Sequence, residues 1–178
     1  MGRDKATIRV GDKPLIRYTY DVVKRIFSRI MVVSSRHEAI EGVEARIVED
    51  VFPISGSMTG IVSALLNSDT GYVFVVGCDM PFLNEQAIRY MIDEVNGEDI
   101  LVPRTEGGLE PTHAIYNRSC ISPMLTALER GQMKIRGVFD LLRVRILPVN
   151  SLFFNGDVSV FTNVNNQEDL ERAKRALR

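Results

Sequence analysis

Asp79 is the first candidate for chemistry in this sequence, because it directly follows an unbroken apolar run from Gly71 to Cys78. Such a run is typical of a strand that is covered on both faces, as in a parallel sheet flanked by helices. Pro81 has no N–H to donate, so the strand should end there and leave Asp79 at the edge where ligands gather in α/β proteins. A carboxylate there suits a hard cation such as Mg²⁺. The structural alternative is that Asp79 helps to start the helix expected near Asn84.

Other polar or small residues also lie at predicted strand ends. Asp50 closes a short apolar strand that begins at Arg46, and the asparagines Asn163 and Asn165 follow a short extended segment near the C-terminus. A loop of small residues that contains Gly56 and Gly60 leads into a helix. Glycines before a helix let backbone N–H groups approach an anion, although such a loop is also typical of an ordinary helix start.

These residue types favour transfer of a phosphoryl or nucleotidyl group over most other chemistry. Such transfer depends mainly on positioning, on a bridging metal and on neutralisation of charge, so carboxylates and a lysine are sufficient. The sequence contains no GxxxxGK[ST], GxGxxG, HExxH or GxSxG pattern, which counts against P-loop, dinucleotide-binding, zincin and hydrolase sites. With His37 and His113 as its two histidines, a histidine-rich metal site is not expected.

The elements that must position these residues alternate between strand and helix, which favours βαβ units. Apolar spacing predicts helices at 13–28, after the loop at 53–60, and at 84–95, 121–128, 135–142 and 167–177. Strands are expected at 7–10, 29–35, 46–50, 71–76, 99–103, 113–116, 143–147 and 158–161. The strand at 143–147 carries arginines, so we expect it at an edge of the sheet or with a half-exposed face.

The length of 178 residues predicts a single α/β domain over the whole chain. The formal net charge of −1 gives no reason to expect binding to nucleic acid or to an anionic membrane. No apolar run is long enough to span a bilayer, and the first residues lack the apolar region of a signal peptide, so a cytoplasmic protein is expected. Cys78 and Cys120 form no CxxC pattern, and each is expected to be a buried reduced thiol.

Six segments of the sequence resemble, in the right order, motifs of the molybdenum cofactor guanylyltransferases. The family motifs are the end of LAGGxSxRMGxDKA, an acidic strand end, GPLAGI, CDMPF, EPLHALY and FxNxNTPEDL. The corresponding segments here are Met1–Ala6, Ile47–Asp50, Gly56–Ile61, Cys78–Phe82, Glu110–Tyr116 and Phe161–Leu170. The resemblance implies a Rossmann-like three-layer fold of the nucleotide-diphospho-sugar-transferase type, with a mostly parallel sheet and helices on both faces.

The resemblance also implies the reaction and its participants. GTP and a molybdopterin phosphate would be the substrates, Mg²⁺ the cofactor, pyrophosphate the leaving group, and other proteins of cofactor biosynthesis would be partners. A related enzyme that uses CTP or a sugar phosphate is one alternative. A nucleotide-binding subunit without catalytic activity is another.

Each candidate residue receives a role from the resemblance. Lys5 would contact the nucleotide phosphates, Asp50 the guanine or ribose region, and Asp79 both the nucleotide and Mg²⁺. The loop with Gly56 and Gly60 would contact the nucleotide. Asn163 and Asn165 would position the pterin-side phosphate or the metal, and His113 would belong to the pterin pocket or its surroundings. Without the resemblance, Lys5 is interpreted as a solvated lysine, and Asn165 or Asn166 as the cap of the last helix.

The sequence departs from the family pattern in two places. Val33-Ser34-Ser35 stands where the family has an asparagine after its second strand, so that nucleotide contact is not expected. The first strand of the family and the LAGGxSxR part of its phosphate loop would precede Met1. Without them, N–H donors and an arginine for the triphosphate are lacking, and the neighbouring strand edges should be exposed. We expect a start codon upstream or a shortened chain, with a naturally inactive relative as the alternative.

Overall fold

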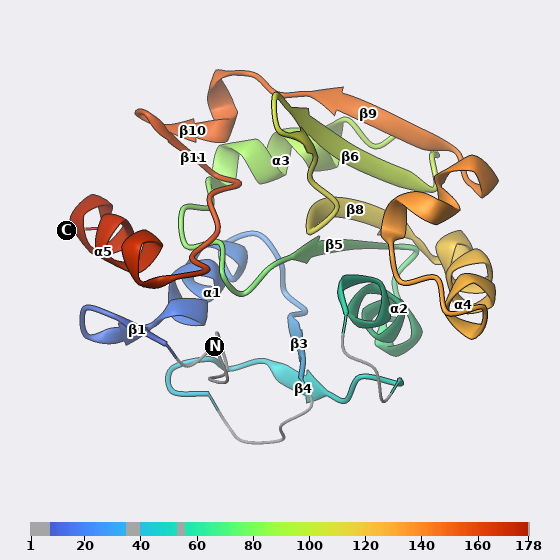
Figure 1. Ribbon diagram of the computed structural model, residues 1–178, viewed down its shortest axis with the longest axis horizontal. Coiled ribbons are helices and arrows are strands. Elements are labelled where there is room, and N and C mark those ends of the chain that lie inside the picture. The colour runs from blue at the N-terminus through green and yellow to red at the C-terminus, as the bar shows by residue number, and fades with distance from the viewer. Residues whose placement is uncertain (1–7, 35–39, 53–55, 178) are drawn as a thin grey trace.

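The structure is a computed structural model that describes residues 8–34, 40–52 and 56–177. Its largest sheet has five strands (Figure 1). These are β5 (Tyr72–Val76), β6 (Ile100–Thr105), β7 (Gly108–Leu109), β8 (His113–Asn117) and β9 (Val144–Pro148). Strand β8 lies between β5 and β6 and is antiparallel to both, β7 is antiparallel to β6, and β9 is parallel to β6.

The described part of the sheet therefore lacks the mostly parallel pairing that the sequence predicted. The reason lies in the connection between β6 and β8, which contains only the short strand β7 and its turns. A parallel pair needs a crossover of roughly a dozen residues or more, so such a short connection returns the chain antiparallel. Strand β9 pairs with β6 alone among the described strands, which confirms the edge position predicted for it.

The remaining described strands form three two-stranded sheets. Strands β3 (Met31–Val33) and β4 (Arg46–Val48) pair in parallel. Two short antiparallel hairpins join β1 (Arg9–Val10) to β2 (Lys13–Pro14), and β10 (Phe154–Asn155) to β11 (Val158–Ser159). The turn of the first hairpin contains Gly11 at φ 65°, a left-handed conformation that glycine adopts without steric cost.

Within the described ranges, five α-helices and three 3₁₀ helices form, and the α-helices lie where the apolar spacing predicted helices. They are α1 (Leu15–Val23), α2 (Ser57–Asn67), α3 (Glu85–Asp93), α4 (Ile121–Glu129) and α5 (Gln167–Ala176). Three short 3₁₀ helices are η2 (Arg118–Cys120), η3 (Ile135–Leu141) and η4 (Ser151–Phe153). The segment predicted as a helix at 135–142 is thus helical but 3₁₀.

Helices cover both faces of the five-stranded sheet, which confirms the predicted three layers (Figure 1). On one face, Met58 and Leu65 of α2 pack with Met124 of α4 against buried residues of β6 and β8. On the other face, Met91 of α3 and Phe153 of η4 pack against a second set of buried residues from the same strands. The architecture is α/β.

Strand β5 is less buried than its sequence predicted. All five residues of Tyr72–Val76 are half-buried, although the apolar run indicated a strand covered on both faces. Within the described ranges, β5 pairs with β8 on one side only and lies at the end of the strand order. The ring of Phe27 stacks on Phe74 with centroids 5.7 Å apart, and this contact covers part of one face. The exposure therefore comes from an edge position within the described sheet.

Cys120 is buried and Cys78 is half-buried, and both are free thiols. Burial raises the pKa of Cys120 to about 12, so this side chain is a protonated, unreactive part of the core. No helix in the described ranges is long and apolar enough to cross a membrane.

Candidate functional site

Asp79 lies in a tight turn directly after β5. The turn is closed by a hydrogen bond of 3.3 Å from the Met80 N–H to the Gly77 carbonyl oxygen. Two further bonds fix its ends: the Gly77 N–H donates to the Thr112 carbonyl at 3.0 Å, and the Thr19 hydroxyl donates to the Met80 carbonyl at 3.0 Å. The Asp79 side chain is half-buried. The fold thus holds a carboxylate at the carboxyl end of a strand, as predicted.

Gly77 leaves room for this carboxylate. A Cβ atom placed on Gly77 would lie 2.6 Å from Oδ1 of Asp79, a distance that no real Cβ contact permits. The side chain of Asp79 therefore folds back over the backbone at residue 77. The sequence analysis counted Gly77 as part of the apolar run and missed this role. The signal that could have revealed it is a glycine two residues before the aspartate.

The structural alternative for Asp79 is settled by Asn84. The side chain of Asn84 accepts hydrogen bonds from the N–H groups of Gln86 at 2.8 Å and Ala87 at 3.4 Å, and is the N-cap of α3. Asp79 is not the cap of this helix, and its carboxylate is therefore not required there.

The C-terminal segment that carries the candidate asparagines contacts the Asp79 turn. The Val164 N–H donates to the Asp79 carbonyl at 2.9 Å, so Asn163 and Asn165 flank a residue anchored on that turn. Asn163 is half-buried and Asn165 is exposed. The cap of α5 is Asn166, which forms a capping box with Asp169. Asn166 is thus the cap among the two residues, Asn165 and Asn166, that were predicted for this role.

His113 lies next to the Asp79 turn but faces the core. It pairs with Val76 across the β5–β8 ladder and has no exposed surface. Its ring packs edge-on against Phe74 and Phe161, with centroids 5.2 and 4.9 Å away, and neither ring nitrogen has a hydrogen-bond partner among the described residues. Burial lowers the pKa of His113 to about 3. The imidazole is thus neutral and packed in the core behind β5, and the role in substrate binding predicted for His113 stays a prediction.

Asp50 is held by the first two turns of α2. The Thr59 hydroxyl donates to Oδ2 of Asp50 at 3.0 Å, and the Ser63 hydroxyl donates to Oδ1 at 2.9 Å. The Phe52 N–H approaches Oδ1 at 3.4 Å. Sequence reasoning missed Thr59 and Ser63, although their spacing of four residues places both hydroxyls on one face of a helix.

The predicted glycine loop opens α2. Gly56 is its N-cap and has no side chain to cap the first turn, so the loop offers backbone N–H groups there. A Cβ atom on Gly60 would meet nothing within 4 Å, which leaves open space beside the backbone. Lys5 and the rest of the segment 1–7 lie outside the described residues.

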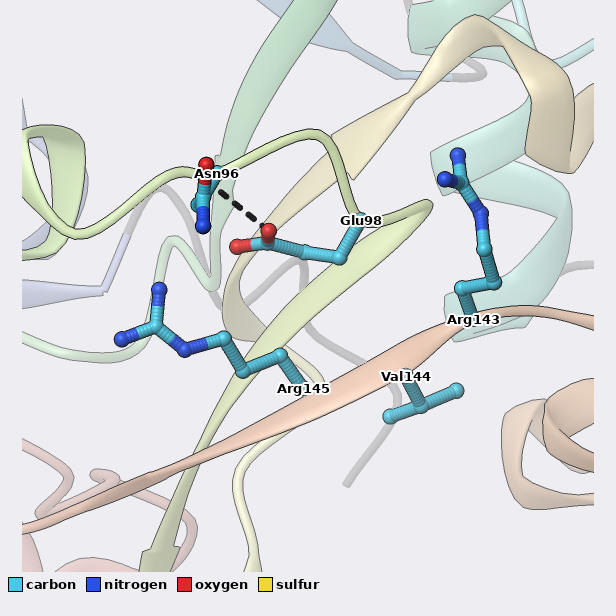
Figure 2. Close-up of a pocket in the computed structure, with 5 residues that line it drawn as sticks. All are labelled: Asn96, Glu98, Arg143, Val144 and Arg145. Atoms are coloured by element: carbon cyan, nitrogen blue, oxygen red, sulfur yellow. Dashed lines mark hydrogen bonds between the residues drawn. The ribbon is translucent and has the colours of Figure 1, made fainter.

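A pocket at the β9 edge is separate from these residues. Figure 2 shows its lining, which consists of Asn96, Glu98, Arg143, Val144 and Arg145. Arg143 pairs with Asp99 and Arg145 with Glu94, so both guanidinium groups are engaged. The pocket precedes the N-terminal end of β6, whereas Asp79 follows the C-terminal end of β5. Because β5 and β6 run in the same direction, the pocket and Asp79 lie at opposite ends of the sheet.

The donor set at Asp79 fits a magnesium ion better than a metal that needs a protein cage. Across the described ranges, no group of three or more His, Cys, Asp or Glu side chains could hold a metal ion. Mg²⁺ is commonly held by one or two carboxylates and completes its coordination with phosphate oxygens and water. The half-buried carboxylate of Asp79 over Gly77 has the chemistry of such a ligand, and its role in metal binding stays a prediction.

Comparisons with known proteins show the family and the fold of this chain. A sequence profile of the MobA-like NTP transferase domain matches residues 1–145. A protein of Desulfosudis oleivorans named molybdenum cofactor guanylyltransferase is 31% identical over 179 residues, which cover 99% of this chain and 89% of that protein. The crystal structure of molybdopterin-guanine dinucleotide biosynthesis protein A from Archaeoglobus fulgidus matches with a TM-score of 0.84 at 27% identity, covering 99% of this chain and 91% of the other.

A third similar structure comes from a Mycobacterium tuberculosis protein solved in complex with manganese. It has a TM-score of 0.66 at 21% identity and covers 98% of this chain and 93% of that one. At this identity the likeness shows the shared fold alone.

Proposed function

This chain belongs to the MobA-like NTP transferase family, and we propose that it transfers GMP from GTP to the phosphate of molybdopterin. An oxygen of the molybdopterin phosphate attacks the α-phosphorus of GTP in line. The new P–O bond forms as the bond between the α-phosphorus and its bridging oxygen to the β-phosphate breaks, and pyrophosphate leaves. The named relative from Desulfosudis oleivorans supports this choice of substrates.

Each candidate residue has a part in this proposal. Asp79 would hold Mg²⁺, which would supply neutralisation of the negative charge on the phosphates of GTP. Lys5 contacts the phosphates, and Asp50 binds the guanine or ribose. The first turn of α2, which follows its N-cap Gly56, lends backbone N–H groups to the nucleotide, and Gly60 leaves open space beside that turn.

Asn163 and Asn165 are proposed to position the pterin-side phosphate. The buried His113 is proposed to support the residues that surround the pterin. One observation supports the proposal for these residues: the hydrogen bond from the Val164 N–H to the Asp79 carbonyl brings the asparagine segment to the turn that carries Asp79. An asparagine amide donates N–H groups to phosphate oxygens without adding charge.

The proposed function also includes where the chain acts and what it binds. The chain acts as one nucleotidyltransferase-like domain in the cytoplasm, with GTP and molybdopterin as small-molecule partners. Other proteins of cofactor biosynthesis would deliver the substrate or receive the product.

The test is product formation from molybdopterin with GTP or CTP, each with Mg²⁺, followed by mass spectrometry of the dinucleotide and by pyrophosphate release. We expect the guanine dinucleotide from GTP and its loss in Asp79→Asn. Asp93→Asn is the matched control, because Asp93 is an exposed residue at the end of α3. A cytosine dinucleotide would contradict the choice of GTP, and GTP binding without any product would favour a non-catalytic subunit.

A further inference from the structure

The carboxylate of Asp50 is fixed at both oxygen atoms by hydroxyl groups of a single helix. Thr59 donates to Oδ2 and Ser63 to Oδ1, at 3.0 and 2.9 Å. Two donors from one rigid helix define the plane of the carboxylate as well as its position, because each oxygen has its own partner. Oδ1 also accepts from the Phe52 N–H at 3.4 Å, whereas Oδ2 retains a lone pair that can accept a hydrogen bond from a ligand.

Thr59 and Ser63 are themselves closed to any ligand. Their side chains belong to residues that are 1% and 0% exposed, whereas Asp50 is half-buried. A ligand can therefore reach Asp50 but neither hydroxyl. The two hydroxyls therefore cannot contact a ligand directly, and the half-buried carboxylate of Asp50 is the accessible group that they orient.

The helix does not depend on Asp50 for satisfying these hydroxyls. The Thr59 hydroxyl also lies 2.7 Å from the Gly56 carbonyl, and the Ser63 hydroxyl lies 2.8 Å from the Thr59 carbonyl. Each hydroxyl has one proton and so can donate to one acceptor at a time. Each hydroxyl therefore has two possible acceptors, a backbone carbonyl and the carboxylate of Asp50. The negative charge of the carboxylate favours donation to Asp50, because hydrogen bonds to charged groups are stronger.

We propose that Thr59 and Ser63 are positioning residues, which orient the carboxylate of Asp50 so that it accepts N–H or O–H groups from the guanine base or ribose of GTP. The inference rests on the proposed function and specifies how nucleotide selectivity is built into it. If GTP had to order the carboxylate on binding, part of its binding free energy would be lost. A carboxylate that is already oriented avoids this loss.

The experiment measures the affinity of wild type, Thr59→Val and Thr59→Ser for GTP and for two analogues. Inosine triphosphate lacks the exocyclic amino group of guanine, and 2′-deoxy-GTP lacks one ribose hydroxyl. In wild type, at least one analogue should bind more weakly than GTP. Thr59→Val keeps the shape of the side chain without the hydroxyl, and should reduce that preference by roughly tenfold, the scale of one hydrogen bond. Thr59→Ser should restore it.

Ser119→Ala is the matched control. Ser119 donates to another carboxylate, Asp99, at 2.6 Å, and its neighbour Arg118 contacts the last turn of α2 at Leu65. This variant also loses a hydroxyl–carboxylate bond but should leave the preference for GTP unchanged.

Three outcomes contradict the inference or its premise in different ways. If Thr59→Val weakens GTP and both analogues equally, the hydroxyl merely stabilises the fold and the inference is wrong. An unchanged preference in Thr59→Val, combined with a lost preference in Asp50→Asn, means that Asp50 acts without Thr59. If wild type itself binds GTP no better than either analogue, the role proposed for Asp50 fails instead.

Discussion

The backbone N–H of Val164 donates a hydrogen bond of 2.9 Å to the carbonyl oxygen of Asp79. Val164 is 2% exposed and packs in a core cluster with Leu15 and Phe82, so this contact is anchored by buried apolar surface. The bond joins the turn after β5 to a segment near the C-terminus. The packing of Val164 therefore helps to fix the position of the neighbouring Asn163 relative to the turn that carries Asp79.

Gly77→Ala should damage the site without damaging the fold. The added Cβ would lie 2.6 Å from Oδ1 of Asp79 and would force the carboxylate to rotate away. Because a misplacement of about 1 Å can cost on the order of 100-fold in rate, we expect activity to fall by roughly 10- to 100-fold. The melting temperature should change little. Gly71→Ala, before the other end of β5, adds a Cβ with nothing within 4 Å and should retain wild-type activity.

Equal effects of the two glycine substitutions on activity would contradict this account, because only Gly77 is in steric conflict with Asp79.

Asn163→Ala and Asn166→Ala should separate activity from stability. The Asn166 side chain caps α5 by accepting from the Asp169 N–H at 2.9 Å, so its loss should cost about 1 kcal/mol in the free energy of unfolding. Asn163 is not this cap, and its substitution should instead lower the affinity for molybdopterin. Urea denaturation and substrate titration of both variants test the separation. The reverse pattern would show that the two asparagines have been assigned the wrong roles.

His113→Phe should remove a pH dependence of stability. The pKa of His113 in the folded chain is about 3, below the value of about 6.5 of an unfolded histidine. Between these pH values, His113 is protonated in the unfolded state but neutral in the folded state. The free energy of unfolding of wild type should therefore fall as the pH falls from 6.5 towards 3. The loss approaches about 1.4 kcal/mol per pH unit for this group.

The measurement is the difference in unfolding free energy between wild type and His113→Phe at pH 7 and pH 5. The variant should gain relative to wild type at the lower pH, since phenylalanine cannot be protonated. A difference that stays constant over this range would show that His113 accepts a proton inside the fold.

Asp99→Asn should reveal a second pH dependence of stability, which comes from a buried carboxylate that is charged in the folded state. Hydrogen bonds from Arg143 and Ser119 hold the pKa of Asp99 well below its usual range. Its contribution to stability is therefore fully present above about pH 4, the ordinary value for aspartate, and is lost as the pH falls further. Asp99→Asn should be destabilised by about 1–3 kcal/mol at pH 7, and the gap to wild type should shrink between pH 4 and pH 2. A gap independent of pH would contradict the pairing.

The positions of the helices and most strands could be predicted from the sequence, because they depend on local periodicity and on turn residues. The end of β5 at Val76, shortly before Asp79, followed from an apolar run that stops ahead of Pro81. The directions of the strands could not be predicted in this way. Periodicity is the same for parallel and antiparallel strands, and the antiparallel return of β8 depends on the short β7 connection.

Burial and the hydroxyl network around Asp50 also escaped prediction. The burial of β5 depends on neighbours distant in sequence, and within the described ranges this strand has a partner on one side only. Thr59 and Ser63 read locally as residues of a small-residue loop and its helix. Their role emerges only when β4 and α2 come together and place Asp50 between them.

The most direct test of the central claim, that Asp79 is the carboxylate that holds the metal with the nucleotide, is isothermal titration of GTP with and without Mg²⁺. Wild type and Asp93→Asn should bind GTP more tightly when Mg²⁺ is present. Asp79→Asn should lose this dependence while keeping the melting temperature within a few degrees of wild type. An Asp79→Asn variant that retains the full effect of Mg²⁺ on GTP affinity would contradict the account.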